Sequence, residues 1–259
     1  MLQVTEAKQV FFRGLPDEKV ALDGLNLTLE SGDFGVVIGS NGAGKSTLLN
    51  AIAGAQRLDS GRVVINGEDV TQMPVHRRAR RVARVFQDPM KGTAASMTIA
   101  ENMLLAEMRR SHPRLRIGLT PARRDRYREQ LSYLGLGLES RLDTQVSLLS
   151  GGQRQSLSLV MAVSDEPDLL LLDEHTAALD PRTAQLVLDA TLRAVSALKL
   201  TTLMVTHNMT HAIDYGNRII MLDAGKVVRE LTGPEKANAT VPQLVEYFSV
   251  KSDRMLLGS

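Results

Sequence analysis

The stretch Gly39-Ser40-Asn41-Gly42-Ala43-Gly44-Lys45-Ser46-Thr47 decides the fold that we expect for this chain of 259 residues. It follows the β-branched run 36–38, and a helical pattern over 46–53 begins within it. Glycines let such a loop curl so that successive N–H groups point at phosphate oxygens, and the helix N-terminus adds a favourable dipole. The stretch therefore predicts a phosphate-binding P-loop, in which Lys45 reaches the β- and γ-phosphates of a nucleotide and the Ser46 hydroxyl binds Mg²⁺. A glycine-rich turn with a surface lysine is the alternative.

Short apolar and β-branched runs recur on both sides of this loop and predict strands. Several are uniformly apolar, which is typical of strands covered on both faces, and helical stretches such as Pro181–Leu198 lie between them. The pattern predicts an α/β fold. From Met97 to Val163 it is helical without a convincing strand, so we interpret this segment as a helical insertion. The predicted strands are Val36–Ile38, Val63–Ile65, Val82–Phe86, Leu169–Leu172, Thr202–Val205 and Ile219–Leu222.

Two adjacent carboxylates, Asp173 and Glu174, follow the apolar run Leu169–Leu172. A buried strand delivers its terminal residues to the ligand-binding edge of an α/β sheet. We expect Asp173 to hold Mg²⁺, directly or through water, and Glu174 to polarise the attacking water as a general base. Taken alone, such a pair is more often a helix N-cap, but the neighbouring P-loop favours the metal and catalytic interpretation.

The sequence Leu149-Ser150-Gly151-Gly152-Gln153 is the most discriminating element. Physically it is a glycine-rich turn capped by Ser150 at a helix N-terminus, which makes a second anion site. Lying between a P-loop and an apolar strand that ends in Asp-Glu, it resembles the signature sequence of the ABC ATPases. The resemblance runs from about Gln9 to about Phe248. It implies a RecA-like P-loop NTPase core, with a mixed sheet and flanking helices, plus an N-terminal antiparallel β region and an inserted α-helical subdomain.

The resemblance also gives the domain boundaries that we expect. Residues 1–240 are predicted to form a single ABC ATPase domain. Its core occupies about 1–90 and 164–233, and its helical insertion about 91–163. Residues 241–259 are predicted to form a short C-terminal helix and tail.

The resemblance implies roles for further residues. In the family, the signature loop contacts the γ-phosphate of ATP held by the opposing subunit, and Asp180 matches the D-loop that lines the dimer interface. Gln87 matches the glutamine that touches Mg²⁺ or the attacking water, and His207 matches the switch histidine at the γ-phosphate. The expected catalytic residues are Glu174, His207, Gln87 and Lys45, and the expected metal ligands are Ser46, Gln87 and Asp173. The residues expected to bind the nucleotide are Phe11, Gly39, Ser40, Asn41, Gly42, Ala43, Gly44, Lys45, Ser46 and Thr47. The loop expected to act on the opposing subunit's nucleotide is Ser150, Gly151, Gly152 and Gln153.

Aromatic and histidine residues complete the candidate site. An aromatic side chain that stacks on adenine is expected before the P-loop, and we prefer Phe11 to Phe12, with core packing as the alternative for both. His175 stands where the family commonly has proline, which we expect to alter the local turn and not the chemistry. His175, like His76, His112 and His211, is interpreted as a surface or packing residue.

Composition excludes several classes of protein. Cysteine is absent, so neither disulfides nor cysteine-ligated metals are possible. No apolar stretch approaches the roughly 18 residues of a membrane-spanning helix, and the N-terminus lacks a signal-peptide core. From His76 to Arg128, thirteen arginines and one lysine stand against four acidic residues, which we interpret as a solvated helical surface, with a face toward anionic lipid as the alternative. Aromatic residues make up 3%, and we expect no nucleic-acid partner.

Within the family, the runs 85–90, 92–94, 96–99 and 173–180 resemble ATPases grouped with tryptophan/tyrosine-type import systems. This implies a head-to-tail homodimer that sandwiches two ATP–Mg²⁺, a separate transmembrane permease, an extracytoplasmic solute-binding protein and a peripheral place on the cytoplasmic face of the membrane. The imported cargo would be a small solute such as an amino acid. The alternatives are a soluble ABC ATPase of a cytosolic assembly system and a regulatory module that binds ATP without hydrolysing it.

The surface that contacts a permease is expected near Gln87 and the segment Met90 to Met103. Flexible methionines at 90, 97 and 103 suit an adaptable groove for a partner helix, although for each methionine taken singly core packing is favoured.

Overall fold

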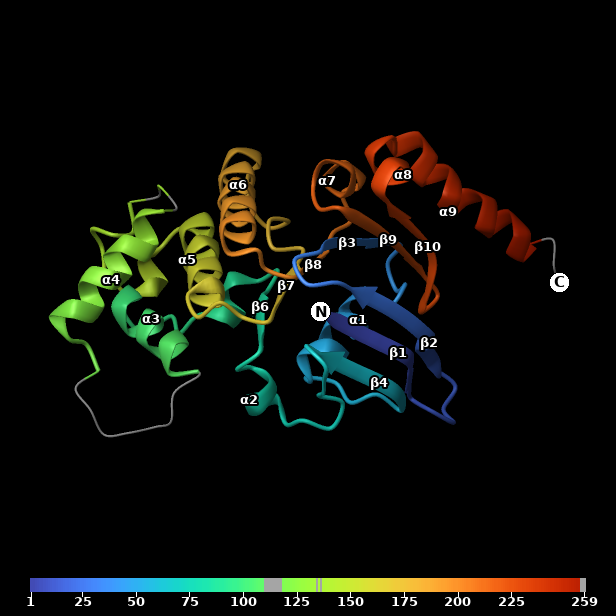
Figure 1. Ribbon diagram of the computed structural model, residues 1–259, viewed down its shortest axis with the longest axis horizontal. Helices are drawn as coiled ribbons and strands as arrows, with labels where there is room; N and C mark the ends of the chain where they lie inside the picture. Colours follow the sequence, from blue (N-terminus) through green and yellow to red (C-terminus); the bar gives the residue numbers. More distant parts are fainter. Residues whose placement is uncertain (110–117, 134, 136, 257–259) are drawn as a thin grey trace.

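Two β-sheets form the centre of the structure, which is a computed structural model describing residues 1–109, 118–133, 135 and 137–256 (Figure 1). The larger sheet has six strands in the order β10-β9-β3-β8-β7-β6. Neighbouring strands are parallel except for the antiparallel pair β9 and β10. Its strands are β3 (Phe34–Gly39), β6 (Val82–Val85), β7 (Leu169–Asp173), β8 (Thr202–Val205), β9 (Arg218–Asp223) and β10 (Lys226–Thr232).

The smaller sheet is antiparallel and has four strands in the order β2-β1-β4-β5. Its register places Phe11, the last residue of β1, opposite Lys19, the first residue of β2. The strands are β1 (Leu2–Phe11), β2 (Lys19–Leu29), β4 (Ser60–Ile65) and β5 (Glu68–Asp69). The predicted strand Val63–Ile65 therefore belongs to this sheet and not to the parallel one.

Alternation along the apolar strands divides the interior into two cores. Successive side chains of a strand point to opposite faces, so Leu170 and Leu172 of β7 pack against the helices that follow β6. Leu169 and Leu171 pack on the other face, with helix α1 (Lys45–Ala53) and the antiparallel sheet. Both faces of the large sheet are covered, which explains why its strands read as continuous apolar runs.

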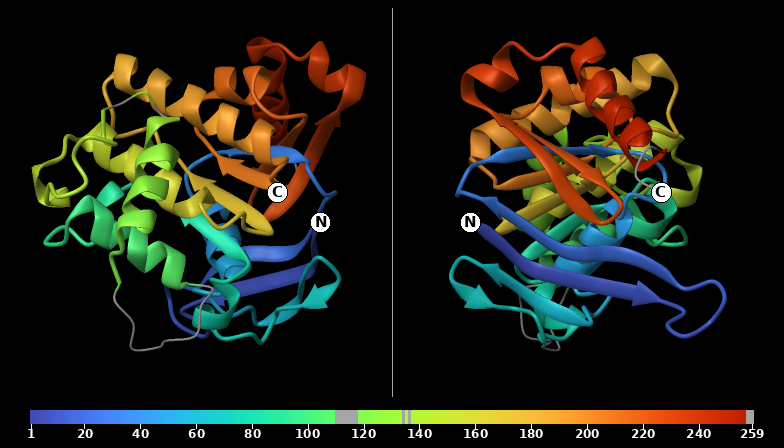
Figure 2. Two further views of the ribbon diagram at one scale, coloured as in Figure 1. Left: turned by 60° about the vertical axis from the view of Figure 1, so that its left-hand side comes forward. Right: turned by 90° about the vertical axis from the view of Figure 1, so that its right-hand side faces the viewer.

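The helices flank the large sheet on both faces. Figure 1 shows α3, α4 and α5 gathered beyond β6 and β7, while the antiparallel sheet lies on the side of α1, and the turned views of Figure 2 agree. The remaining helices are α2 (Val75–Arg78), α3 (Ile99–Met108), α4 (Pro121–Ser132), α5 (Gly151–Val163), α6 (Pro181–Leu198), α7 (Met209–Asp214), α8 (Gly233–Ala237) and α9 (Val241–Leu256), with 3₁₀ turns η1 (Pro89–Gly92) and η2 (Val146–Leu148).

The α/β fold class predicted from the sequence is confirmed. Between β6 and β7 the described residues are helical or turn, apart from a single bridge between Thr98 and Gln145. Of the two interpretations of Met103, core packing is the one observed: its side chain is 1% exposed, because it packs in the core on the inner face of α3. It therefore cannot line a surface groove, whereas Met90 and Met97 are exposed.

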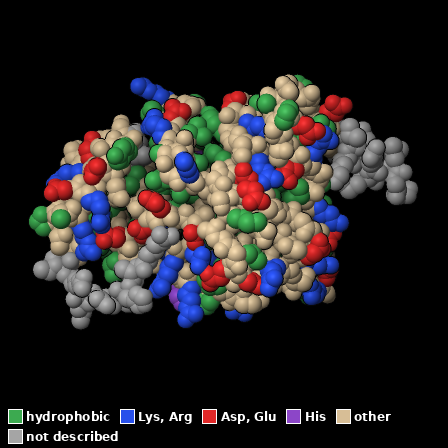
Figure 3. Space-filling view, viewed as in Figure 1, with side chains coloured by type: hydrophobic (Ala, Val, Ile, Leu, Met, Phe, Trp, Pro, Cys, Tyr) green, Lys and Arg blue, Asp and Glu red, His purple; other side chains and the backbone are tan. Residues whose placement is uncertain are grey.

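Six arginines of the basic block form ion pairs with neighbouring acids. Figure 3 shows Lys and Arg side chains interspersed with Asp and Glu over the visible face. Arginines of the block that form ion pairs are Arg81, Arg84, Arg123, Arg124, Arg126 and Arg128. This pairing supports the interpretation as an ordinary solvated surface. Among the residues that the structure describes, no helix is long and apolar enough to cross a bilayer.

Candidate active site

The P-loop joins the end of β3 to the start of α1. It therefore lies at the edge of the large sheet. Close packing explains its glycines: a Cβ on Gly39 would stand 2.3 Å from the Leu222 carbonyl oxygen. Gly44 has a φ of +104°, in the left-handed region, and a Cβ there would stand 2.4 Å from the Ala21 carbonyl oxygen. Neither position accepts a side chain without a shift of the backbone.

Lys45 begins α1 and folds back over the loop. Its ammonium donates hydrogen bonds to the carbonyl oxygens of Gly39 at 2.7 Å and Ser40 at 3.0 Å. Burial lowers the pKa of the Lys45 ammonium, and the carboxylates of Glu174 and Asp173 oppose that shift. The ammonium is thus held at the centre of the loop, facing both carboxylates.

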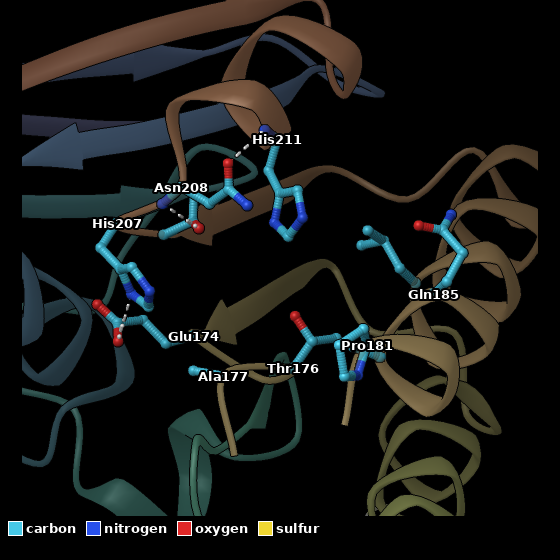
Figure 4. A pocket seen from close by; sticks show the side chains of 11 residues that line it. Glu174, Thr176, Ala177, Pro181, Gln185, His207, Asn208 and His211 are labelled. Atoms are coloured by element: carbon cyan, nitrogen blue, oxygen red, sulfur yellow. Dashed lines mark hydrogen bonds and ion pairs between the residues drawn. The ribbon is translucent and has the colours of Figure 1, made fainter. Parts of the chain in front are cut away.

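Glu174 stands at the end of β7 in a conformation that few glutamates adopt. Its φ is +43°, in the left-handed region, and its N–H donates to the Val205 carbonyl oxygen of β8 at 3.0 Å. Strained backbone of this kind gathers at functional sites. Figure 4 shows Glu174 and His207 pointing toward each other from the ends of β7 and β8, with Nδ1 of His207 3.2 Å from Oε2 of Glu174.

A cavity of about 370 Å³ brings most of the candidate residues together. Phe11 enters it from β1, the P-loop forms its base, and Gln87, Asp173 and Glu174 close it from the ends of β6 and β7. Phe12 is 64% exposed, and it is absent from the described residues that line the cavity. The lining residues are Phe11, Lys19, Ala21, Asn41, Gly42, Gly44, Lys45, Ser46, Thr47, Gln87, Asp173 and Glu174.

The same cavity offers the donors that Mg²⁺ prefers. The Ser46 hydroxyl, the Asp173 carboxylate and the Gln87 amide oxygen all belong to lining residues. In nucleotide sites Mg²⁺ is commonly held by one or two carboxylates together with substrate phosphates. No cluster of three or more His, Cys, Asp or Glu occurs in the described part of the chain, so no cage of these residues competes for the ion there. These residues fit a magnesium ion that arrives with a nucleotide.

The signature loop stands apart from this cavity. Ser150 caps α5: its hydroxyl accepts from the Gln153 N–H at 3.3 Å, and the Gln153 side chain accepts from the Ser150 N–H at 3.2 Å. None of the described cavity-lining residues comes from 150–153. A Cβ on Gly152 would stand 1.9 Å from Cγ2 of Thr183, so α5 begins in close contact with α6.

Asp180 is the N-cap of α6. Its carboxylate accepts from the Thr183 N–H at 3.1 Å, and the hydrogen bonds with Thr183 lower the pKa of that carboxyl. Asp180 is therefore fixed beside the signature helix on the surface of the subunit.

The other histidines divide between surface and interior. His175 is 2% exposed, and its Nε2 lies 3.1 Å from the Thr191 hydroxyl of α6. Burial, together with the nearby His211, lowers the pKa of His175 to about 4. His175 is thus a packing residue. His211 lines a second cavity of about 340 Å³ beside Glu174 and His207. His76 is exposed, and His112 lies outside the described residues.

Three polar residues of the site lie outside the sequence motifs. Lys19 lines the cavity, with its ammonium 3.2 Å from the point where a Cβ on Gly42 would stand. Arg84 and Asn50 lie behind Asp173 and contact each other. The pairing of Phe11 with Lys19 across a hairpin could have suggested the first. No sequence spacing pointed to the other two, because they are distant along the chain.

Known proteins resemble this chain over most of its length. The family model described as ABC transporter matches residues 22–177. The chain is 42% identical to a tyrosine transport ATP-binding protein of Clostridioides difficile (strain R20291), over 96% of this chain and 98% of that protein. It is 35% identical to the methionine import ATP-binding protein MetN 2 of Enterococcus faecalis (strain ATCC 700802 / V583), over 85% of this chain and 61% of that protein.

Solved structures show the same relationship. The dimeric post-hydrolysis state of the ATP-binding cassette MJ0796, bound to ADP and Pi, matches with a TM-score of 0.77 and 27% identity, over 90% of this chain and 98% of that chain. The family match spans more than half of the sequence, and the tyrosine transport relative covers nearly all of it. The chain therefore belongs to the ABC transporter family and is one of its ATPases.

Proposed function

We propose that this ATPase energises a separate membrane permease that imports a small solute such as an amino acid. The observation that carries the catalytic part is the single cavity lined by Phe11, the P-loop, Gln87, Asp173 and Glu174. An aromatic ring at one end and phosphate-binding and acidic groups at the other match the two ends of ATP–Mg²⁺.

The proposed hydrolysis begins with a water molecule beside Glu174. Its carboxylate takes a proton as the water oxygen attacks the γ-phosphorus, and the bond from that phosphorus to the β–γ bridging oxygen breaks, so that ADP leaves with the bridging oxygen and phosphate is released. The His207 side chain, 3.2 Å from the carboxylate, orients it and contacts the γ-phosphate. Lys45 stabilises the charge that develops on the transferred phosphoryl group. Bound Mg²⁺, held by Ser46, Gln87 and Asp173, would neutralise phosphate charge.

The proposed working form is a head-to-tail homodimer with two ATP–Mg²⁺ between its subunits. The signature loop Ser150–Gln153 supports this, because it carries the capped helix N-terminus of an anion site yet does not line the cavity of its own subunit. Asp180 and the start of α6 lie against that loop, so they would share the interface. The related cassette MJ0796 is described as dimeric.

The proposed permease contact uses the exposed apolar side chains Met90, Met97 and Leu148. The segment that carries Met97 is tied to η2: the Val146 N–H donates to the Met97 carbonyl oxygen at 3.0 Å. This surface begins directly after Gln87, so a partner seated there would touch the segment that leads to the metal site. The similarity to a tyrosine transport protein and a methionine import protein supports an amino acid as cargo.

The remaining parts of the proposal follow from an import system of this kind. They are a peripheral position on the cytoplasmic face of the membrane and an extracytoplasmic solute-binding protein. The division into a core at about 1–90 and 164–233, a helical insertion at about 91–163 and a C-terminal segment from 241 belongs to the same proposal.

The test of catalysis compares wild type with Glu174→Gln, purified after co-expression with membrane proteins encoded beside it. Loss of the general base should slow ATP turnover by about 10²- to 10⁴-fold while ATP binding is retained. Glu129→Gln, an exposed glutamate on α4, is the matched control and should leave turnover unchanged. Hydrolysis that is equal in wild type and Glu174→Gln would refute the assignment of the base. Glu174-dependent hydrolysis with no co-purifying membrane protein would favour a soluble assembly ATPase.

The test of the permease surface uses Met97→Asp. A charge on this exposed apolar position should uncouple solute uptake from hydrolysis and leave basal ATP turnover unchanged, because Met97 lies outside the cavity. Val75→Asp, on exposed α2, controls for the added surface charge. Equal loss of uptake and basal hydrolysis in Met97→Asp would argue against a docking surface here.

A further inference from the structure

Arg84 is an interior side chain of β6 that no catalytic motif includes. Its side chain is 12% exposed and pairs with Asp173, whose side chain is 15% exposed. Nη2 of Arg84 donates to Oδ2 of Asp173 at 2.5 Å, and Nη1 donates to Oδ1 of Asn50 at 2.6 Å. One guanidinium therefore joins the end of β7 to helix α1.

The contact with Asn50 places this link one turn below a metal-binding hydroxyl. Ser46 and Asn50 are four residues apart in α1, so they lie on the same face of the helix. Asp173 ends the neighbouring strand β7. The planar guanidinium of Arg84 contacts both Asn50 and Asp173. It thereby sets the distance between α1, which carries Ser46, and the end of β7, which carries Asp173.

Arg84 also reaches the segment that carries Gln87. Its guanidinium carbon lies 4.7 Å from the centre of the Phe86 ring, within the range of a cation–π contact. The Phe86 carbonyl oxygen accepts a hydrogen bond from the Gln155 side chain of α5 at 2.9 Å. The residue before Gln87 is therefore fixed from two sides.

We propose that Arg84 is a positioning residue of the magnesium site, which holds Ser46, Gln87 and Asp173 at the spacing that the ion requires. This rests on the proposed use of these residues for Mg²⁺. Groups behind metal ligands orient them, and their removal commonly weakens metal binding by about 10- to 100-fold. Arginine suits the role better than lysine, because its planar fork holds the two donors in a fixed geometry, whereas a lysine ammonium is a compact charge on a flexible stem.

The experiment titrates Mg²⁺ against the full chain with a fluorescent, non-hydrolysable ATP analogue, and repeats the binding in EDTA. Arg84→Met should raise the Mg²⁺ concentration for half-saturation by about tenfold or more, while affinity for the analogue in EDTA stays at the wild-type value. For Arg84→Lys, the Mg²⁺ concentration for half-saturation should lie between those of wild type and Arg84→Met. Arg81→Met is the matched control, because Arg81 pairs with Asp168 at the opposite end of β7, and it should behave as wild type.

Each other result would overturn the proposal. An unchanged Mg²⁺ requirement would leave Arg84 a structural residue, and a lower requirement would make it a competitor of the ion. Equal loss of analogue binding in EDTA and in Mg²⁺ would mean that it shapes the P-loop and not the metal site. Should Arg84→Met fail to fold, Asn50→Ala breaks the α1 contact alone, and a wild-type requirement in that variant would refute the spacing role. Failure of the proposed metal site itself would show in the wild type, as binding that does not depend on Mg²⁺.

Discussion

The buried imidazole of His175 should make the stability of this ATPase depend on pH. The side chain is 2% exposed, directly after the proposed general base, and its Nε2 lies 3.1 Å from the Thr191 hydroxyl. That hydroxyl donates to the Val187 carbonyl oxygen at 2.8 Å, so it accepts from His175, whose Nε2 therefore carries the proton of the neutral ring. Replacement by glutamine keeps an amide donor near this position and removes the titration.

The magnitude follows from the difference between two pKa values. Burial lowers the pKa of His175 from its ordinary 6.5 to about 4 in the folded chain. Between these values the unfolded chain binds a proton that the folded chain does not, so the free energy of unfolding falls as the pH falls. At about 1.4 kcal/mol for each unit of pKa difference, the loss attributable to His175 between about pH 7.5 and about pH 5 is about 2 kcal/mol.

The assay is denaturant unfolding of wild type and His175→Gln at several pH values in this range. Wild type should lose about 2 kcal/mol more than the variant on acidification, and the two curves should run parallel above the ordinary histidine pKa. His76→Gln removes an exposed histidine and should track wild type. If wild type and His175→Gln lose stability equally, the imidazole is not held neutral by burial, and the reasoning is refuted.

Further predictions concern the edges of the site. Phe11→Ala should weaken ATP binding by about 1–3 kcal/mol, the usual contribution of an aromatic–base stack, and Phe12→Ala should not; equal effects in a nucleotide titration would contradict the choice of Phe11. Lys19→Gln should weaken binding of ATP and ADP but not of adenosine, because its ammonium lies over Gly42 of the P-loop; an equal effect on all three ligands would place it at the base or ribose. Gly152→Ala should slow hydrolysis, because its Cβ would meet Cγ2 of Thr183. Adding Thr183→Ser removes that methyl group and should restore turnover in a steady-state assay. If turnover is not restored, the contact with Thr183 is not the cause of the loss.

Local patterns foretold the parts of the fold that depend on neighbours along the chain. The uniformly apolar run Leu169–Leu172 predicted a strand covered on both faces, and its side chains do enter both cores. The run Pro181–Leu198 is the extent of α6 in the structure. The edge strand β10 was missed, because its residues Lys226–Thr232 mix exposed and half-buried positions and carry charges, so no uniform apolar run marks them.

Contacts between distant segments could not be read in this way. Met103 was one of the methionines considered for a surface groove, but α3 turns its side chain into the core. No residue spacing in the sequence specified which face of this helix carries Met103. Arg84 and Asp173 are far apart in sequence and meet only because β6 and β7 pair in parallel, with Arg84 next to Leu171 in the register. A charge in an apolar strand was the available signal, since such a residue needs a partner.

The charged groups of the site share a feature that bears on how nucleotide is bound and released. Lys45 donates to carbonyl oxygens of its own loop, Asp173 pairs with Arg84, and Glu174 meets His207. Each contact satisfies a group that would otherwise need water or ligand, so the site is held in shape by the chain itself. Binding of phosphate to Lys45 must replace its contacts with the loop carbonyls, so the net gain in free energy from this residue is the difference between the two sets of contacts. The contacts of Asp173 with Arg84 and of Glu174 with His207 need not be broken, because they hold the two carboxylates where the proposed metal ion and the attacking water would meet them.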